Sequence, residues 1–138
     1  MISLDHMFKT KRGARLGQHF LKSKWAARSL AYAADIAQGD AVLEIGPGKG
    51  ALTRELLAIS KEVGARVVAI EKDWALIAHL NEIFCDEINS GVLMVQSADI
   101  RDVNPKKLGL ISGKYVVAAN IPYYITGEII RKFLTAEE

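Results

Sequence analysis

Apolar residues along the chain follow two different spacings, which together predict strands separated by helices. Short apolar runs typical of buried strands occupy residues 41–45, 66–70, 92–95 and 115–119. Strands that alternate with helices predict an α/β fold, in which right-handed crossovers give a parallel sheet with helices on both faces. The helical spacing is seen in residues 25–37, then in Leu52, Leu56, Ile59 and Val63, in Leu76, Ile77, Leu80, Ile83 and Phe84, and in Ile129, Ile130, Phe133 and Leu134.

The last predicted strand and helix indicate that the fold is incomplete at the C-terminus. Doubly wound sheets usually contain five or more strands, whereas only four are predicted here, and the chain ends within the last helical segment. In the usual strand order, the strand at 115–119 would lie at an unprotected edge of the sheet. We expect such an edge to favour association with another chain.

The length and composition agree with one globular domain. Half of the 138 residues are hydrophobic, enough to bury a core and to exclude a disordered protein. No apolar run approaches the ~20 residues of a membrane span, so no membrane association is expected. The single cysteine, Cys85, excludes an internal disulfide and a site built from several cysteines, and no metal is expected. Charged residues stand where a secretory signal would be apolar, so the cytoplasm is the expected compartment.

Positive charge is concentrated near the N-terminus. Residues 1–28 contain seven basic side chains against one acidic side chain, a net charge of +6, whereas the rest of the chain carries −4. A basic arm over residues 1–22 fits contact with nucleic-acid phosphates, because each contact releases counterions. A solvated tail is the alternative interpretation. The candidate RNA-contacting residues are Lys9, Lys11, Arg12 and Arg15.

A glycine-rich turn follows the strand at 41–45 and leads into a helix. Gly46, Gly48 and Gly50 allow a tight turn and a close approach of a ligand to the main chain, and the helix N-terminus offers N–H groups to an anionic group. The third glycine comes one residue too early for the dinucleotide pattern G-x-G-x-x-G, which disfavours an NAD-dependent oxidoreductase. The turn therefore predicts a nucleotide-type site, with a ligand-free turn as the alternative.

Two acidic residues follow the next two strands. Glu71 stands 21 residues beyond Gly50, where a carboxylate can accept hydrogen bonds from both hydroxyls of a ribose. Asp99 follows the strand at 92–95, where it can accept a hydrogen bond from the exocyclic amine of adenine. Both lie at carboxyl ends of parallel strands, where open α/β sheets bind ligands. An exposed strand-end carboxylate is the alternative for Glu71.

The strand at 115–119 leads into Asn120-Ile121-Pro122-Tyr123, which suits chemistry on the amine of adenine. This amine is a poor nucleophile because its lone pair is delocalised into the ring. The Asn120 side-chain oxygen and a main-chain carbonyl near Pro122 can accept its two N–H bonds, which directs the lone pair at an electrophile. Tyr123 can stack on the base, a contact worth ~1–3 kcal/mol. An Asn-Pro turn beside a core tyrosine is the structural alternative.

Five segments of the chain form an ordered set of motifs: LGQHFL at 16–21, EIGPGKGALT at 44–53, AIE at 69–71, ADI at 98–100 and NIPYYIT at 120–126. With them the chain resembles the ribosomal RNA adenine N6-dimethyltransferases, which use S-adenosylmethionine and include the small-subunit dimethyladenosine transferases and the erythromycin-resistance methylases. The resemblance implies a Rossmann-like methyltransferase fold. Residues 23–138 would form the N-terminal portion of the catalytic domain, without its last strands and without the family's C-terminal helical domain.

The resemblance also implies roles for individual residues. In the family, the segment at 18–21, which belongs to the arm of residues 1–22 in this chain, closes over the cofactor. Lys72 departs from the apolar residue that usually follows the ribose-binding Glu. The implied S-adenosylmethionine contacts are Gln18, His19, Leu21, Gly46, Gly48, Glu71, Asp99 and Asn120, and the implied catalytic residues are Asn120, Pro122 and Tyr123.

The implied activity is transfer of the sulfonium methyl group to N6 of adenine, twice on each base, after the base has left its stack. Pro47 and residues 51–53 look more like the ribosome-biogenesis branch, which modifies two adjacent adenines near the 3′ end of small-subunit RNA. Ribosomal RNA in a small-subunit precursor is then the expected partner. The alternatives are a large-subunit methylase of the macrolide-resistance type and a non-catalytic RNA-binding or assembly factor. A DNA adenine methyltransferase fits less well, because its motif order differs.

Overall fold

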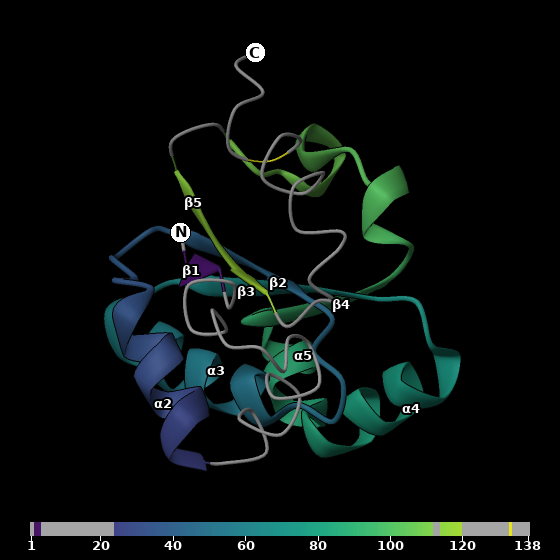
Figure 1. The fold of residues 1–138 in the computed structure, drawn as a ribbon, viewed down its shortest axis with the longest axis horizontal. Coiled ribbons are helices and arrows are strands. Elements are labelled where there is room, and N and C mark those ends of the chain that lie inside the picture. The colour runs from purple at the N-terminus through teal and green to yellow at the C-terminus, as the bar shows by residue number, and fades with distance from the viewer. Residues whose placement is uncertain (1, 4–23, 112–113, 120–132, 134–138) are drawn as a thin grey trace, which may run out of the picture.

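The computed structural model describes residues 2–3, 24–111, 114–119 and 133, which form a parallel sheet with helices packed against it (Figure 1). Within these residues, five strands lie in the order β1-β5-β2-β3-β4, and every neighbouring pair is parallel. The α/β fold predicted from the sequence is therefore confirmed. The strands are β1 (Ile2–Ser3), β2 (Ala41–Ile45), β3 (Arg66–Glu71), β4 (Leu93–Ser97) and β5 (Tyr115–Ala119).

The prediction that the strand at 115–119 lies at the sheet edge is wrong. β2 pairs with all five residues of β5 on one side, and β1 pairs with Ala118 and Ala119 on the other. The outer edge of β5 is therefore covered at its C-terminal end, because the first residues of the chain pair with it. Two residues of the segment 1–22, which the charge pattern assigned to an arm, therefore belong to the sheet.

Side chains that alternate along the strands divide the core between the two faces of the sheet. Val42 of β2 belongs to the cluster beneath the helices, whereas its neighbour Leu43 belongs to the cluster on the opposite face. The α-helices of the described residues lie on one side of the sheet (Figure 1), and two 3-10 turns together with Phe133 cover the other side. The helices are α2 (Lys24–Ala33), α3 (Ala51–Val63), α4 (Trp74–Ile83) and α5 (Cys85–Ser90), and the turns are η2 (Ile100–Asp102) and η3 (Pro105–Leu108).

Local signals explain where the helices begin and end. Asp73 caps α4, since its side chain accepts hydrogen bonds from the N–H groups of Ala75 and Leu76. Gly64 ends α3 in the left-handed conformation, with φ 80°. α2 ends at Ala33, before the predicted end at residue 37, and Asp35 soon afterwards adopts a φ of 51° that a helix does not allow. Of the helices described, none is long and apolar enough to cross a membrane.

Candidate functional site

The loops that follow β2, β3 and β4 meet at the carboxyl edge of the sheet. The N–H of Gly46 donates to the Ile70 carbonyl at 3.0 Å, which joins the glycine turn to the end of β3. The N–H of Ala98 donates to the Glu71 carbonyl, also at 3.0 Å, which joins the end of β3 to the loop that carries Asp99. The glycine turn, Glu71 and Asp99 are thereby brought together, as the sequence predicts.

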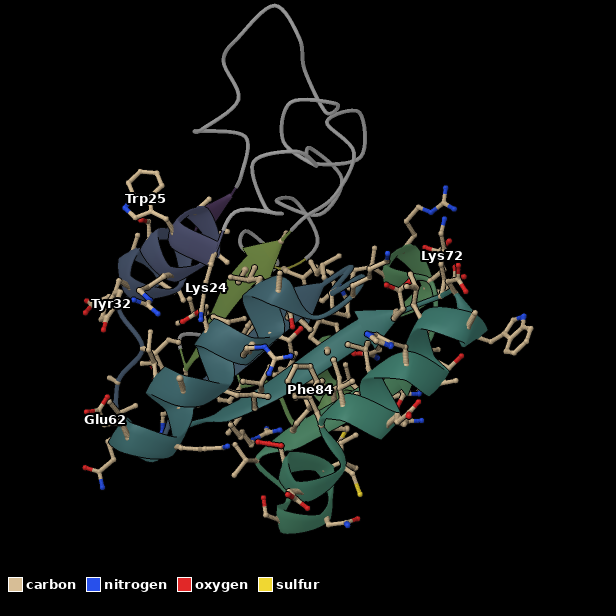
Figure 2. All side chains as sticks on the ribbon, turned by 90° about the horizontal axis from the view of Figure 1, so that it is seen from below. Lys24, Trp25, Tyr32, Glu62, Lys72 and Phe84 are labelled. Atoms are coloured by element: carbon tan, nitrogen blue, oxygen red, sulfur yellow. The ribbon has the colours of Figure 1, made fainter. Side chains whose placement is uncertain are left out.

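The glycine turn contains two positions where glycine serves different purposes. Gly50 has a φ of 91°, and a Cβ atom there would lie 2.7 Å from a ring carbon of Phe84, which Figure 2 shows between α3 and α4. Gly48 also has a positive φ, 57°, but a Cβ atom there would meet nothing within 4 Å. Gly50 is therefore required for packing, whereas Gly48 leaves open space in which a ligand can approach the main chain.

Glu71 ties the glycine turn to the loop after β3. One carboxylate oxygen, Oε1, accepts a hydrogen bond from the Gly48 N–H at 3.2 Å. The other, Oε2, accepts from the N–H groups of Lys72 at 2.9 Å and Asp73 at 3.1 Å. A carboxylate has about four acceptor positions, so one remains for a donor from outside, such as a hydroxyl group. The exposed strand-end carboxylate considered from the sequence is excluded, because Glu71 is buried, with 7% of its surface exposed.

Asp99 is held by a partner that the sequence did not predict. Its carboxylate accepts hydrogen bonds from the main-chain N–H of Arg101 at 2.9 Å and from the Arg101 guanidinium, at 2.6 Å to Nη2. These bonds, with the nearby positive charge of Lys72, hold the pKa of Asp99 well below its ordinary value. Asp99 is therefore ionised at neutral pH and acts as an acceptor at this edge of the sheet.

Glu44 is a buried carboxyl group that the sequence analysis did not single out. It lies in β2 with 1% of its surface exposed, and its Oε2 accepts a hydrogen bond from the Thr53 hydroxyl of α3 at 2.7 Å. Its Oε1 has no hydrogen-bond partner among the described residues. Burial raises the pKa of Glu44 from 4.5 to about 8, opposed by the Thr53 hydrogen bond and reinforced by the negative charge of Glu71. The available signal was a lone acid within the apolar run 41–45.

These groups fit a ligand that carries hydroxyl and N–H donors. Glu71 and Asp99 are acceptors at neighbouring strand ends, and Gly48 leaves room beside the main chain. A nucleoside has donors of both kinds, on its ribose and on its base. In the part of the chain that the structure describes, there is no group of three or more His, Cys, Asp or Glu side chains that could hold a metal ion.

The remaining predicted site residues lie outside the described part of the chain, and their roles stay predictions. They are Gln18, His19 and Leu21 of the segment expected to close over the cofactor, the basic residues Lys9, Lys11, Arg12 and Arg15, and the catalytic candidates Asn120, Pro122 and Tyr123.

Comparisons with known proteins relate the whole arrangement to RNA-modifying enzymes. A family model described as "Ribosomal RNA adenine dimethylase" matches residues 9–138. The chain is 39% identical over 132 residues to a ribosomal RNA small subunit methyltransferase A of Dehalococcoides mccartyi, and 41% identical over 120 residues to the protein of that name in Acaryochloris marina. The matches cover 96% and 87% of this chain and 42% of each relative, so the chain spans about two-fifths of their length.

Solved structures agree on the fold. The 23S rRNA methyltransferase ErmE is 29% identical and superposes with a TM-score of 0.65, over 80% of this chain and 41% of that chain. An RNA methyltransferase from Salinibacter ruber, solved in complex with S-adenosyl-L-homocysteine, is 20% identical with a TM-score of 0.50, over 60% of this chain and 52% of that chain. At that identity the second match shows the fold alone. The predicted Rossmann-like methyltransferase fold is thus confirmed.

Proposed function

Because this chain belongs to the ribosomal RNA adenine dimethylase family, we propose that its protein transfers methyl groups from S-adenosylmethionine to N6 of adenines in ribosomal RNA. The family match over residues 9–138 carries the proposal. The hydrogen bond between the glycine turn and Glu71 supports it, because the carboxylate then lies beside the open space at Gly48.

S-adenosylmethionine, when bound, supplies a methyl group on a positively charged sulfur. The residues of this chain bind and orient it: Glu71 accepts a hydrogen bond from a ribose hydroxyl, Asp99 accepts one from the adenine amine, and the turn at Gly48 admits the ligand to the main chain. Gln18, His19 and Leu21 close over the site in this proposal.

Asn120, Pro122 and Tyr123 act on the target base. The Asn120 side-chain oxygen and a main-chain carbonyl near Pro122 accept the two N–H bonds of the target amine, which localises its lone pair toward the methyl group. Tyr123 stacks on the extruded base and offsets part of the few kcal/mol lost when the base leaves its stack. S-adenosylmethionine bound there would supply the methyl group, with its sulfur as the leaving group, and the methylated amine would need no strong base to release its proton to water.

The substrate that fits best is a precursor of the small ribosomal subunit, methylated at two adjacent adenines near the 3′ end of its RNA, in the cytoplasm. The curated relatives named for the small subunit are 39% and 41% identical to this chain, against 29% for the 23S rRNA enzyme ErmE. Lys9, Lys11, Arg12 and Arg15 contact RNA phosphates in this proposal. The ErmE match favours the second candidate, a large-subunit adenine methylase.

Transfer of a labelled methyl group distinguishes the candidates. The protein that carries this chain is incubated with methyl-labelled S-adenosylmethionine and separated ribosomal subunits, and the nucleosides are then analysed. We expect N6,N6-dimethyladenosine in small-subunit RNA, and none with Asn120→Ala. A matched control is Glu62→Ala, an exposed position on α3 labelled in Figure 2. Label in large-subunit RNA would establish the second candidate, and RNA binding without any label would indicate a non-catalytic assembly factor.

A further inference from the structure

Arg101 restrains Asp99 through both its main chain and its side chain. Asp99 Oδ1 accepts hydrogen bonds from the Arg101 main-chain N–H at 2.9 Å and from Nε at 3.0 Å. Asp99 Oδ2 accepts from Nη2 at 2.6 Å, with a longer contact to Nε at 3.3 Å. The Nε–H is shared between the two oxygens, so three N–H groups in all occupy both acceptor positions of Oδ1 and one position of Oδ2. One acceptor position therefore remains, on Oδ2.

This arrangement fixes the direction in which Asp99 can accept a further hydrogen bond. A guanidinium that binds both oxygens of a carboxylate orients the plane of that carboxylate, which a single ammonium group cannot do. The loop itself is fixed, because Ala98 is hydrogen-bonded to the Glu71 carbonyl. Lys72, which Figure 2 shows in the loop between β3 and α4, adds a second positive charge close to Asp99.

The pair contributes little to folding. The Arg101 side chain is 56% exposed and that of Asp99 is 25% exposed, and ion pairs between such side chains have small effects on stability. The two residues are also only two positions apart, so their contact does not join distant parts of the chain. The geometry of the Asp99–Arg101 bonds fits a role at the ligand.

We infer that Arg101 is a positioning residue for adenine recognition: it holds Asp99 so that the remaining acceptor position on Oδ2 takes one N–H of the adenine amine. This inference rests on the proposed function, and it adds the source of the selectivity for adenine. A base with a carbonyl oxygen at the same position would place an acceptor against an acceptor, and the fixed carboxylate could not turn away from it.

The test compares two ligands whose bases differ at that position and in the proton on the adjacent ring nitrogen. S-adenosylhomocysteine, which has the amine, and S-inosylhomocysteine, which has a carbonyl, are titrated calorimetrically into wild type, Arg101→Ala, Arg101→Lys and the control Lys107→Ala, an exposed cation of η3. We expect Arg101→Ala to reduce the preference for the adenine ligand about tenfold, Arg101→Lys to restore part of it, and Lys107→Ala to match wild type.

The possible results separate the inference from the proposed function. Thermal unfolding of each variant is measured alongside, and if Arg101→Ala is unfolded, the comparison of Arg101→Lys with wild type decides. An unchanged ratio of the two affinities in folded Arg101 variants, including an equal loss of affinity for both ligands, would overturn the inference. The proposed function would then still stand. Failure of the folded wild type to bind S-adenosylhomocysteine would overturn both.

Discussion

Replacing Glu44 with Gln should stabilise the protein at neutral pH. The carboxyl group lies in β2 with 1% of its surface exposed, and one of its oxygens has no hydrogen-bond partner among the described residues. Ionisation at that position is opposed by burial, which raises the pKa of Glu44 from 4.5 to about 8. Gln is neutral, has nearly the same shape, and keeps an oxygen that can accept the hydrogen bond from Thr53.

The magnitude follows from the pKa change. A pKa raised on folding from 4.5 to about 8 means that the unfolded chain releases the Glu44 proton first as the pH rises. The contribution of Glu44 to stability is therefore fully present below pH 4.5 and is lost as the pH rises to about 8, by about 5 kcal/mol in all. Between pH 5 and pH 7 the loss is about 3 kcal/mol.

Denaturant unfolding between pH 5 and pH 8 measures this loss. The control is Glu62→Gln, an acid-to-amide change on the exposed side of α3. The free energy of unfolding of Glu44→Gln, minus that of wild type, should increase by about 3 kcal/mol from pH 5 to pH 7, whereas Glu62→Gln should stay parallel to wild type. Parallel curves for Glu44→Gln and wild type would refute the reasoning, because they would mean that Glu44 has the same pKa in the folded and unfolded states.

Two further predictions concern the glycine turn and the target base. Gly50→Ala should lower the free energy of unfolding by about 1–3 kcal/mol, because its Cβ would lie 2.7 Å from a ring carbon of Phe84. The loss should exceed that of the control Gly39→Ala, where φ is similarly unfavourable at 82° but a Cβ would meet nothing within 4 Å. Equal losses in denaturant unfolding would show that the contact with Phe84 is unimportant. Asn120→Ala should abolish methyl transfer to ribosomal RNA while leaving the dissociation constant of S-adenosylmethionine largely unchanged; undiminished turnover would remove Asn120 from the proposed mechanism.

β2, β3 and β5 could be predicted closely because most of their side chains are buried, whereas β4 runs from Leu93 to Ser97 instead of 92–95 and buries only Leu93. β2 and β5 have the predicted bounds, and β3 extends one residue beyond the prediction to include Glu71. An acidic residue ends an apolar run in the sequence, yet the ladder continues to Glu71 because its main chain pairs with Ser97 of β4. Burial on both faces of a parallel sheet produces the continuous apolar runs by which such strands are recognised.

The features that the sequence did not reveal depend on contacts between distant residues or on side-chain geometry. β1 contains only Ile2 and Ser3, and it is a strand because it pairs with Ala118 and Ala119, more than a hundred residues away in the chain. No local pattern distinguishes two such residues from a loop. The pairing of Arg101 with Asp99 likewise depends on the turn at η2, which directs the guanidinium back at the carboxylate.

The candidate site could be predicted as a set of residues but not as a bonded network. The positions of the glycine turn, Glu71 and Asp99 followed from the rule that ligands bind at the carboxyl ends of parallel strands. The direct bond from Gly48 to Glu71 spans 23 positions and required the register of β2 against β3. Glu44 was missed because a single acid in a strand is usually exposed. Its burial becomes evident only in the folded structure, where Thr53 of α3 donates a hydrogen bond to it.

Calorimetric titration with S-adenosylmethionine tests the central claim that the carboxyl edge of β2, β3 and β4 binds this cofactor. Wild type, Glu71→Ala and Glu62→Ala are compared, with circular dichroism to establish that each is folded. We expect saturable binding by wild type and Glu62→Ala, and a loss of roughly 1–3 kcal/mol of binding free energy in Glu71→Ala. Equal affinity of folded Glu71→Ala and wild type, or no binding by folded wild type, would contradict the claim.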